Sequence, residues 1–99
     1  MAMAEAAQST IKDETVQNTE KLAFKRLTTL MTEMMQREDL SGALAVVSSA
    51  VQQYDNVAIA TANRGGDKNE QRGSAALAVI FHTGMLRGEL LKDASNPTL

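Results

Sequence analysis

Apolar side chains recur every three or four residues through most of this chain, which is the spacing of one face of an α-helix. The clearest stripe alternates steps of four and three residues without a break: Leu40, Leu44, Val47, Val51, Tyr54, Ala58 and Thr61. We therefore predict a helix over residues 40–62. We expect Asp39 to cap its first turn, because an Asp side chain there accepts a hydrogen bond from a free backbone N–H.

Two further stripes flank this one. Residues 19–37 carry an apolar row at the same spacing, with other apolar residues beside it: Ala23, Leu27, Leu30 and Met34, then Phe24, Met31 and Met35. The spacing resumes over 74–92 at Leu77, Phe81, Gly84, Gly88 and Leu91, with Ser74 as the expected cap. A run such as ALAVIF, 76–81, would also suit a buried strand, but the continued helical spacing favours helix.

These stripes predict an all-α protein, a three-helix antiparallel hairpin or bundle with coiled-coil-like seams. At 99 residues the chain is one domain. Residues 19–93 form the expected helical domain. Residues 1–18 contain few large aliphatic side chains, so we expect a flexible or partner-ordered polar arm. Residues 94–99 hold the only proline and are expected to form a polar tail.

The predicted seams offer more apolar surface than the first helix alone can cover. Residues 75–81 are all apolar, and a helix that is apolar nearly all round must be covered on more than one side. Gly84 and Gly88 lie one above the other on that helix and allow another helix to approach closely. We therefore expect an oligomer, with a helix-packing or subunit interface at Leu44, Val47, Val51, Tyr54, Leu77, Phe81, Gly84, Gly88 and Leu91.

Composition and charge exclude several classes of protein. The chain has no cysteine and one histidine, which argues against a disulfide framework, a metal site or a cofactor. A net charge of −2 argues against a nucleic-acid-binding face. No apolar run approaches the roughly 20 residues that span a bilayer, and the first residues do not resemble a signal peptide. We expect a cytoplasmic protein, or one within a particle assembled in the cytoplasm.

The single histidine, His82, is the one obvious candidate for catalysis. A catalytic histidine needs a nucleophile or an orienting carboxylate within reach, and the sequence indicates neither. The acidic residues of the first predicted helix are spread as on a solvated face. We therefore expect no enzyme activity and a surface or interface role for His82.

The polar segment TANRGGDKNEQRG, 61–73, is the candidate ligand site. Glycine-rich turns that lead into a helix can bind phosphate through backbone N–H groups. The candidate anion-binding residues are Arg64, Gly65, Gly66, Lys68, Arg72 and Ser74. Their order matches no phosphate-loop motif, and Asp67 and Glu70 offset the local charge. The other interpretation is a solvated turn in which Gly65 or Gly66 ends the preceding helix in the left-handed conformation.

The leading hypothesis is a non-enzymatic helical self-assembly or interaction protein, which binds itself, a larger protein assembly, or both. A small structural subunit of a larger particle, such as a virion, is one concrete form of it. The alternative is an oligomeric binding module that sequesters a nucleotide or another small anionic ligand through the loop between the second and third helices.

Overall fold

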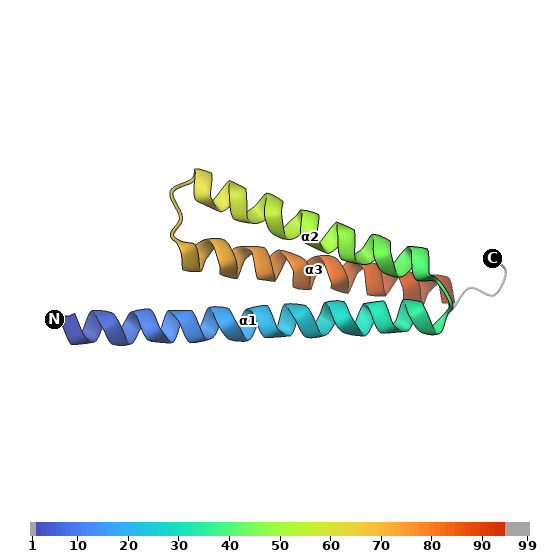
Figure 1. Ribbon diagram of the computed structural model, residues 1–99, viewed down its shortest axis with the longest axis horizontal. Helices are drawn as coiled ribbons and strands as arrows, with labels where there is room; N and C mark the ends of the chain where they lie inside the picture. The colour runs from blue at the N-terminus through green and yellow to red at the C-terminus, as the bar shows by residue number, and fades with distance from the viewer. Residues whose placement is uncertain (1, 95–99) are drawn as a thin grey trace.

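Three helices make up the structure of this protein, a computed structural model that describes the backbone of residues 2–94 and the side chains of 13–90. They are α1 (Ala2–Gln36), α2 (Leu40–Asn63) and α3 (Lys68–Ala94). The helices run up, down and up, and α3 lies beside both of the others (Figure 1). The residues described contain no strand. The predicted all-α, three-helix antiparallel bundle is confirmed.

The turn between α1 and α2 is closed by two backbone hydrogen bonds. Glu38 N–H donates to the Met35 carbonyl at 2.9 Å, and Asp39 N–H donates to the Met34 carbonyl at 3.0 Å. Glu38 itself adopts the left-handed conformation, with φ of 60°. This is the Schellman arrangement that ends many helices, with glutamate where glycine is usual. Asp39 then caps α2 as predicted, since its Oδ1 accepts from Gly42 N–H at 2.8 Å.

The end of α2 repeats the same arrangement with glycine in place. Gly65 has φ of 85°, and its N–H donates to the Ala62 carbonyl at 3.0 Å. Gly66 N–H donates to the Thr61 carbonyl, also at 3.0 Å. Gly65 is therefore the left-handed residue that the sequence indicated at one of these two positions.

The start of α3 differs from the prediction. The helix begins at Lys68, and Asp67 Oδ1 accepts from Glu70 N–H at 2.8 Å, so Asp67 acts as the cap. Ser74 was the wrong cap, because it lies inside the helix. The lack of apolar residues over 68–73 suggested a loop. However, Lys, Glu, Gln and Arg are good helix formers and need no buried face.

The start of α1 also differs. The helix begins at Ala2 rather than Thr19, in keeping with a stretch rich in Ala, Glu and Gln and free of Gly and Pro. Val16 is buried and lies close to Gly73 of α3, where an added Cβ would be 3.5 Å from its Cγ2. The predicted boundary at residue 19 was therefore wrong, since packing against α3 already includes Val16. Apart from Ala94, the predicted tail lies outside the residues described.

The core between the helices is built largely from small side chains. Its central cluster is Ala23, Ala50, Ala76 and Val79, with Leu27, Tyr54 and Ile80 packed against it. Among the side chains described, Leu30 is the largest that is fully buried. Alanines at a helix contact let the helix axes approach closely, which makes the core thin. Many of the large apolar residues therefore lie elsewhere.

Candidate functional site

Large apolar side chains are exposed on all three helices. Those with the highest exposed fractions are Phe81 at 72% and Phe24 at 71%. Among side chains 13–90, the exposed large apolar residues are Leu22, Phe24, Met35, Leu40, Leu44, Val51, Ile59, Leu77, Phe81 and Met85. Single exposed apolar residues are ordinary on protein surfaces, whereas contiguous apolar patches mark binding sites. Whether these residues mark a binding site therefore depends on whether they form contiguous patches.

The first group lines an apolar groove between α1 and α2, which contact each other less than either contacts α3. The cavity in this α1/α2 groove has a volume of about 250 Å³. Its lining is Glu20, Ala23, Phe24, Leu27, Ala50, Val51, Tyr54, Ala76 and Val79. The alanines are buried and form the floor, while Phe24 and Val51 are exposed at the rim.

The apolar edges of the α1/α2 groove continue toward the turn that joins the two helices. Helical periodicity places Leu44 and Leu40 on the same face of α2 as Val51, and Met35 on the same face of α1 as Phe24. All five side chains are exposed. The groove is thus the deepest part of a longer apolar strip.

The second group forms what we term the outer face of α3, which consists of Leu77, Phe81, Gly84, Met85 and Gly88. Leu77, Phe81 and Met85 are exposed, and a Cβ added at Gly84 or Gly88 would meet no atom within 4 Å. Hence none of the residues that the structure describes packs directly on the two glycines.

The outer face of α3 and the α1/α2 groove lie on opposite sides of the molecule. Val79 contributes to the floor of the groove. Leu77 and Phe81 are each two residues from Val79, and two residues correspond to about 200° around a helix. The two apolar surfaces therefore point away from each other.

The structure divides the predicted interface residues between these two surfaces. Val51 and Tyr54 line the groove, Leu44 lies on its extended edge, and Val47 is half-buried on the same side of α2. Leu77, Phe81, Gly84 and Gly88 are on the outer face of α3. The side chain of Leu91 lies outside those described. Whether these residues bind a partner remains a prediction.

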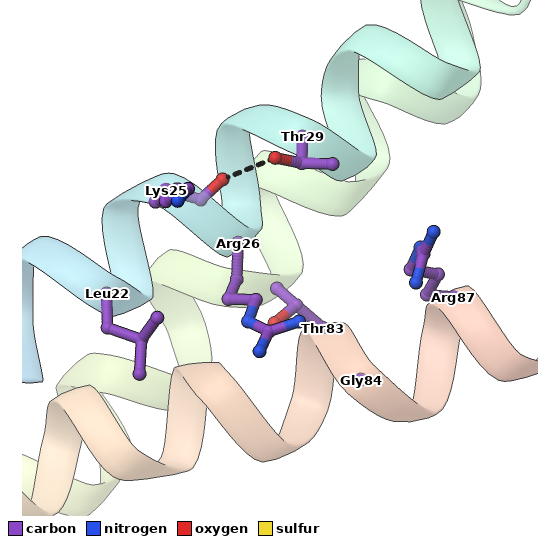
Figure 2. Close-up of a pocket in the computed structure, with 7 residues that line it drawn as sticks. All are labelled: Leu22, Lys25, Arg26, Thr29, Thr83, Gly84 and Arg87. Carbon is purple, nitrogen blue, oxygen red and sulfur yellow. Dashed lines mark hydrogen bonds between the residues drawn. The ribbon is translucent and has the colours of Figure 1, made fainter.

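A basic pocket between α1 and α3 is a site that sequence reasoning missed. Figure 2 shows its lining: Leu22, Lys25, Arg26, Thr29, Thr83, Gly84 and Arg87. The pocket has a volume of about 310 Å³, and the Arg26 side chain extends from α1 toward Thr83 on α3. No motif connects Lys25 and Arg26 with Arg87, because only the packing of α1 on α3 brings them together.

The cations of the basic pocket are only partly neutralised. Arg87 Nε donates to Glu33 Oε1 at 3.2 Å. Among side chains 13–90, no carboxylate forms an ion pair with Lys25 or Arg26. The pocket therefore presents net positive charge on a chain whose total charge is −2.

The predicted anion-binding loop does not form one site. Gly65 and Gly66 lie in the turn, whereas Arg72 and Ser74 lie within α3. The carboxylate of Asp67 already accepts from the first turn of α3, the position that a bound anion would take.

Arg72 in particular is already bound to carboxylates of α1. Its Nη2 and Nε form a fork with Glu20, at 2.6 Å to Oε1 and 3.2 Å to Oε2, and its Nη1 reaches Asp13 Oδ1 at 3.1 Å. The hydrogen bonds that the guanidinium donates to Glu20, and next to Asp13, raise its pKa above the ordinary value. Arg72 therefore clamps α3 to α1, and Arg64 and Lys68 remain as the exposed cations of the loop.

His82 forms a hydrogen bond with Ser49 that joins α3 to α2. A hydroxyl beside an imidazole is also the beginning of a nucleophile–base pair. Here both residues lie well inside helices, where the backbone N–H groups are used by the helix and cannot form an oxyanion hole. We interpret the pair as a contact that fixes α2 against α3.

Comparison with known proteins finds no family model, no curated protein and no solved structure that matches this chain. Within the described part of the chain, no helix has the length and hydropathy needed to cross a membrane. The same residues contain no group of three or more His, Cys, Asp or Glu side chains placed to hold a metal ion. The two apolar surfaces and the basic pocket are therefore the features of the molecule that bear on its function.

Proposed function

We propose that this protein is a non-enzymatic helical association protein that binds copies of itself, a larger protein assembly, or both. One observation carries the proposal. Alanines occupy the core, while phenylalanine, leucine and methionine side chains are exposed on two apolar surfaces. Complete burial of one such large side chain is worth about 1.5–3 kcal/mol, so covering either surface would stabilise an assembly substantially.

A small structural subunit of a larger particle, such as a virion, is the form of this function that we favour. Two association surfaces on opposite sides allow a subunit to contact more than one neighbour, as a repeating assembly requires. We place this assembly in the cytoplasm.

Thermal unfolding tests the association function. If subunits bind each other only when folded, the midpoint temperature, Tm, rises with protein concentration. We expect this rise for the wild-type chain and its loss in Phe81→Glu, which places a charge on the outer face of α3. A wild-type Tm that does not change with concentration would count against self-association.

A second proposed function is the binding of a phosphate-bearing small molecule in the basic pocket. The observation that favours it is the convergence of Lys25, Arg26 and Arg87 on one cavity of about 310 Å³. This volume is at the lower end for small-molecule sites and suits a phosphate or a small phosphorylated compound. This proposal places the anion site between α1 and α3, and not in the loop between α2 and α3.

Ligand-induced thermal stabilisation separates these two anion sites. With inorganic phosphate, pyrophosphate and ATP as probes, we expect a rise in Tm that Arg26→Ala abolishes and Arg64→Ala preserves. The reverse result would restore the loop as the site. If none of the probes shifts the wild-type Tm, the protein does not bind these anions.

A further inference from the structure

We propose that the α1/α2 groove binds the outer face of α3 from a second copy of this chain, so that subunits associate head to tail. This inference rests on the proposed self-association and specifies which surfaces meet.

The position of the groove suits an incoming helix. The groove between α1 and α2 lies across from α3, which contributes Ala76 and Val79 to its floor, so a fourth helix position is open there. Four-helix bundles are closed by a helix in this position, which contacts two neighbours and faces the third across the core. A helix from a second copy would complete the bundle.

The two surfaces are complementary in side-chain size. The groove floor is made of Ala23, Ala50 and Ala76, which leave space above them. The outer face of α3 supplies large side chains, led by Phe81, to fill that space. Next to them Gly84 and Gly88 carry no side chain, so the incoming helix can approach the groove rim closely.

The opposite orientation of the two surfaces dictates how subunits associate. A subunit that offers its α3 to one neighbour keeps its own groove free for another. Such a contact joins two different surfaces and is heterologous, so it produces a closed ring or an open filament and not a symmetric dimer.

The exposed area is large enough for two such contacts. The chain exposes 7160 Å², whereas a compact monomer of its mass of 10.6 kDa exposes about 5,500 Å². The elongated shape therefore leaves more surface for contacts between copies than a compact chain would, and an interface of standard size covers roughly 800 Å² of each partner. The net charge of −2 adds little repulsion between copies.

Complementation between two blocked variants tests this arrangement. Val51→Glu places a charge on the groove rim, and Phe81→Glu places one on the outer face of α3. Both side chains are exposed by more than half, so the folded chain tolerates either change. Gln52→Glu, at an exposed neighbouring position, is the control for the added charge. Circular dichroism confirms that each variant is helical, and sedimentation velocity measures its mass.

We expect the wild type and Gln52→Glu to form species larger than dimers and each blocked variant alone to be monomeric. An equimolar mixture of Val51→Glu and Phe81→Glu should form a heterodimer of about twice the 10.6 kDa chain mass, because one intact groove meets one intact α3 face. Self-association that survives Val51→Glu, or a mixture that remains monomeric, would overturn the head-to-tail contact alone. A monomeric wild type would overturn the proposed self-association as well.

Discussion

Leu30 and Phe81 both carry large apolar side chains, but only Leu30 contributes to the core of the protein. Leu30 is 2% exposed and lies in the core, whereas Phe81 is 72% exposed. Removing a buried leucine leaves a cavity that the surrounding helices fill only in part. Removing an exposed phenylalanine leaves the interior unchanged.

Leu30→Ala should therefore lower the free energy of unfolding by about 3–4 kcal/mol. Phe81→Ala is the matched control and should change it by less than about 0.5 kcal/mol when the protein is dilute enough to be monomeric. Urea titration followed by circular dichroism measures both. Equal losses for the two variants would mean that Phe81 packs inside the monomer, contrary to the structure.

Glu38 has a backbone conformation that is unfavourable for a residue with a Cβ. At φ of 60° it ends α1 in the left-handed region, which costs a residue with a Cβ about 1–2 kcal/mol. Glycine avoids this cost, although it has more conformational entropy to lose on folding.

Glu38→Gly should raise the free energy of unfolding by up to about 1 kcal/mol, because glycine is the usual residue at this position. Chemical denaturation measures the change. Arg37→Gly, one residue earlier and not left-handed, is the control and should not stabilise the protein. A Glu38→Gly variant less stable than the wild type would contradict the conformation described for this turn.

At the scale of the helices, the contact between α1 and α3 includes a charged clamp beside its apolar packing. Arg72 joins the first turns of α3 to Asp13 and Glu20 on α1. Its raised pKa makes the guanidinium lose its proton only in strongly alkaline solution, above the pH at which a free arginine does. The clamp therefore loses nothing from titration of Arg72 near neutral pH.

Arg72→Gln should loosen residues 13–20 of α1 while the rest of the bundle remains folded, since α2 and α3 still pack through the alanine core. Hydrogen exchange should show faster exchange over 13–20 and little change in α2. Arg64→Gln removes an exposed arginine outside this clamp and should leave exchange unaltered. Unchanged protection in Arg72→Gln would show that the clamp does not hold α1.

Replacing Gly84 in α3 by alanine should have two opposite effects: a more stable helix and weaker association. Within one chain a Cβ at Gly84 meets nothing, so Gly84→Ala should stabilise the helix by about 1 kcal/mol. Measured in the monomeric Phe81→Glu background, the free energy of unfolding should rise. In the otherwise wild-type chain, the same change should weaken association, because the second helix that we propose would approach closely there. Equal association with and without Gly84→Ala would argue against close docking on the glycines.

Much of this arrangement of helices could be predicted from the spacing of apolar residues. The three helices, the Asp39 cap and the left-handed glycine after α2 follow from periodicity and local chemistry. The early starts of α1 and α3 do not, because residues such as Gln71 and Arg72 form helix without an apolar stripe. The Arg72 clamp and the basic pocket join residues more than 50 positions apart, as with Arg72 and Glu20, and only tertiary packing reveals them.

At the scale of the whole molecule, the sequence did not indicate which stripe faces inward. Helices α2 and α3 each carry a row of small residues and a row of large ones at the same period, and both rows suit a seam. The structure places Ala50 and Ala76 inside and leaves Val51 and Leu77 outside. Close packing of three helices around small side chains explains this choice, and it leaves the larger side chains available for a partner.

The molecule is also more extended than a compact chain of its length. Its radius of gyration is 16.8 Å, against about 13 Å expected for a globular domain of this size. Its dimensions are 64 × 24 × 20 Å, so a large share of its residues lies near the surface. A thin, elongated molecule with two opposite apolar surfaces suits the repeated association that we propose.

The mass of the wild-type chain in solution, measured by sedimentation equilibrium from low to high micromolar concentration, tests this account most directly. Head-to-tail association through the groove and the outer face of α3 predicts a weight-average mass that rises with concentration beyond that of a dimer. A mass that stays at 10.6 kDa over the whole range would contradict it.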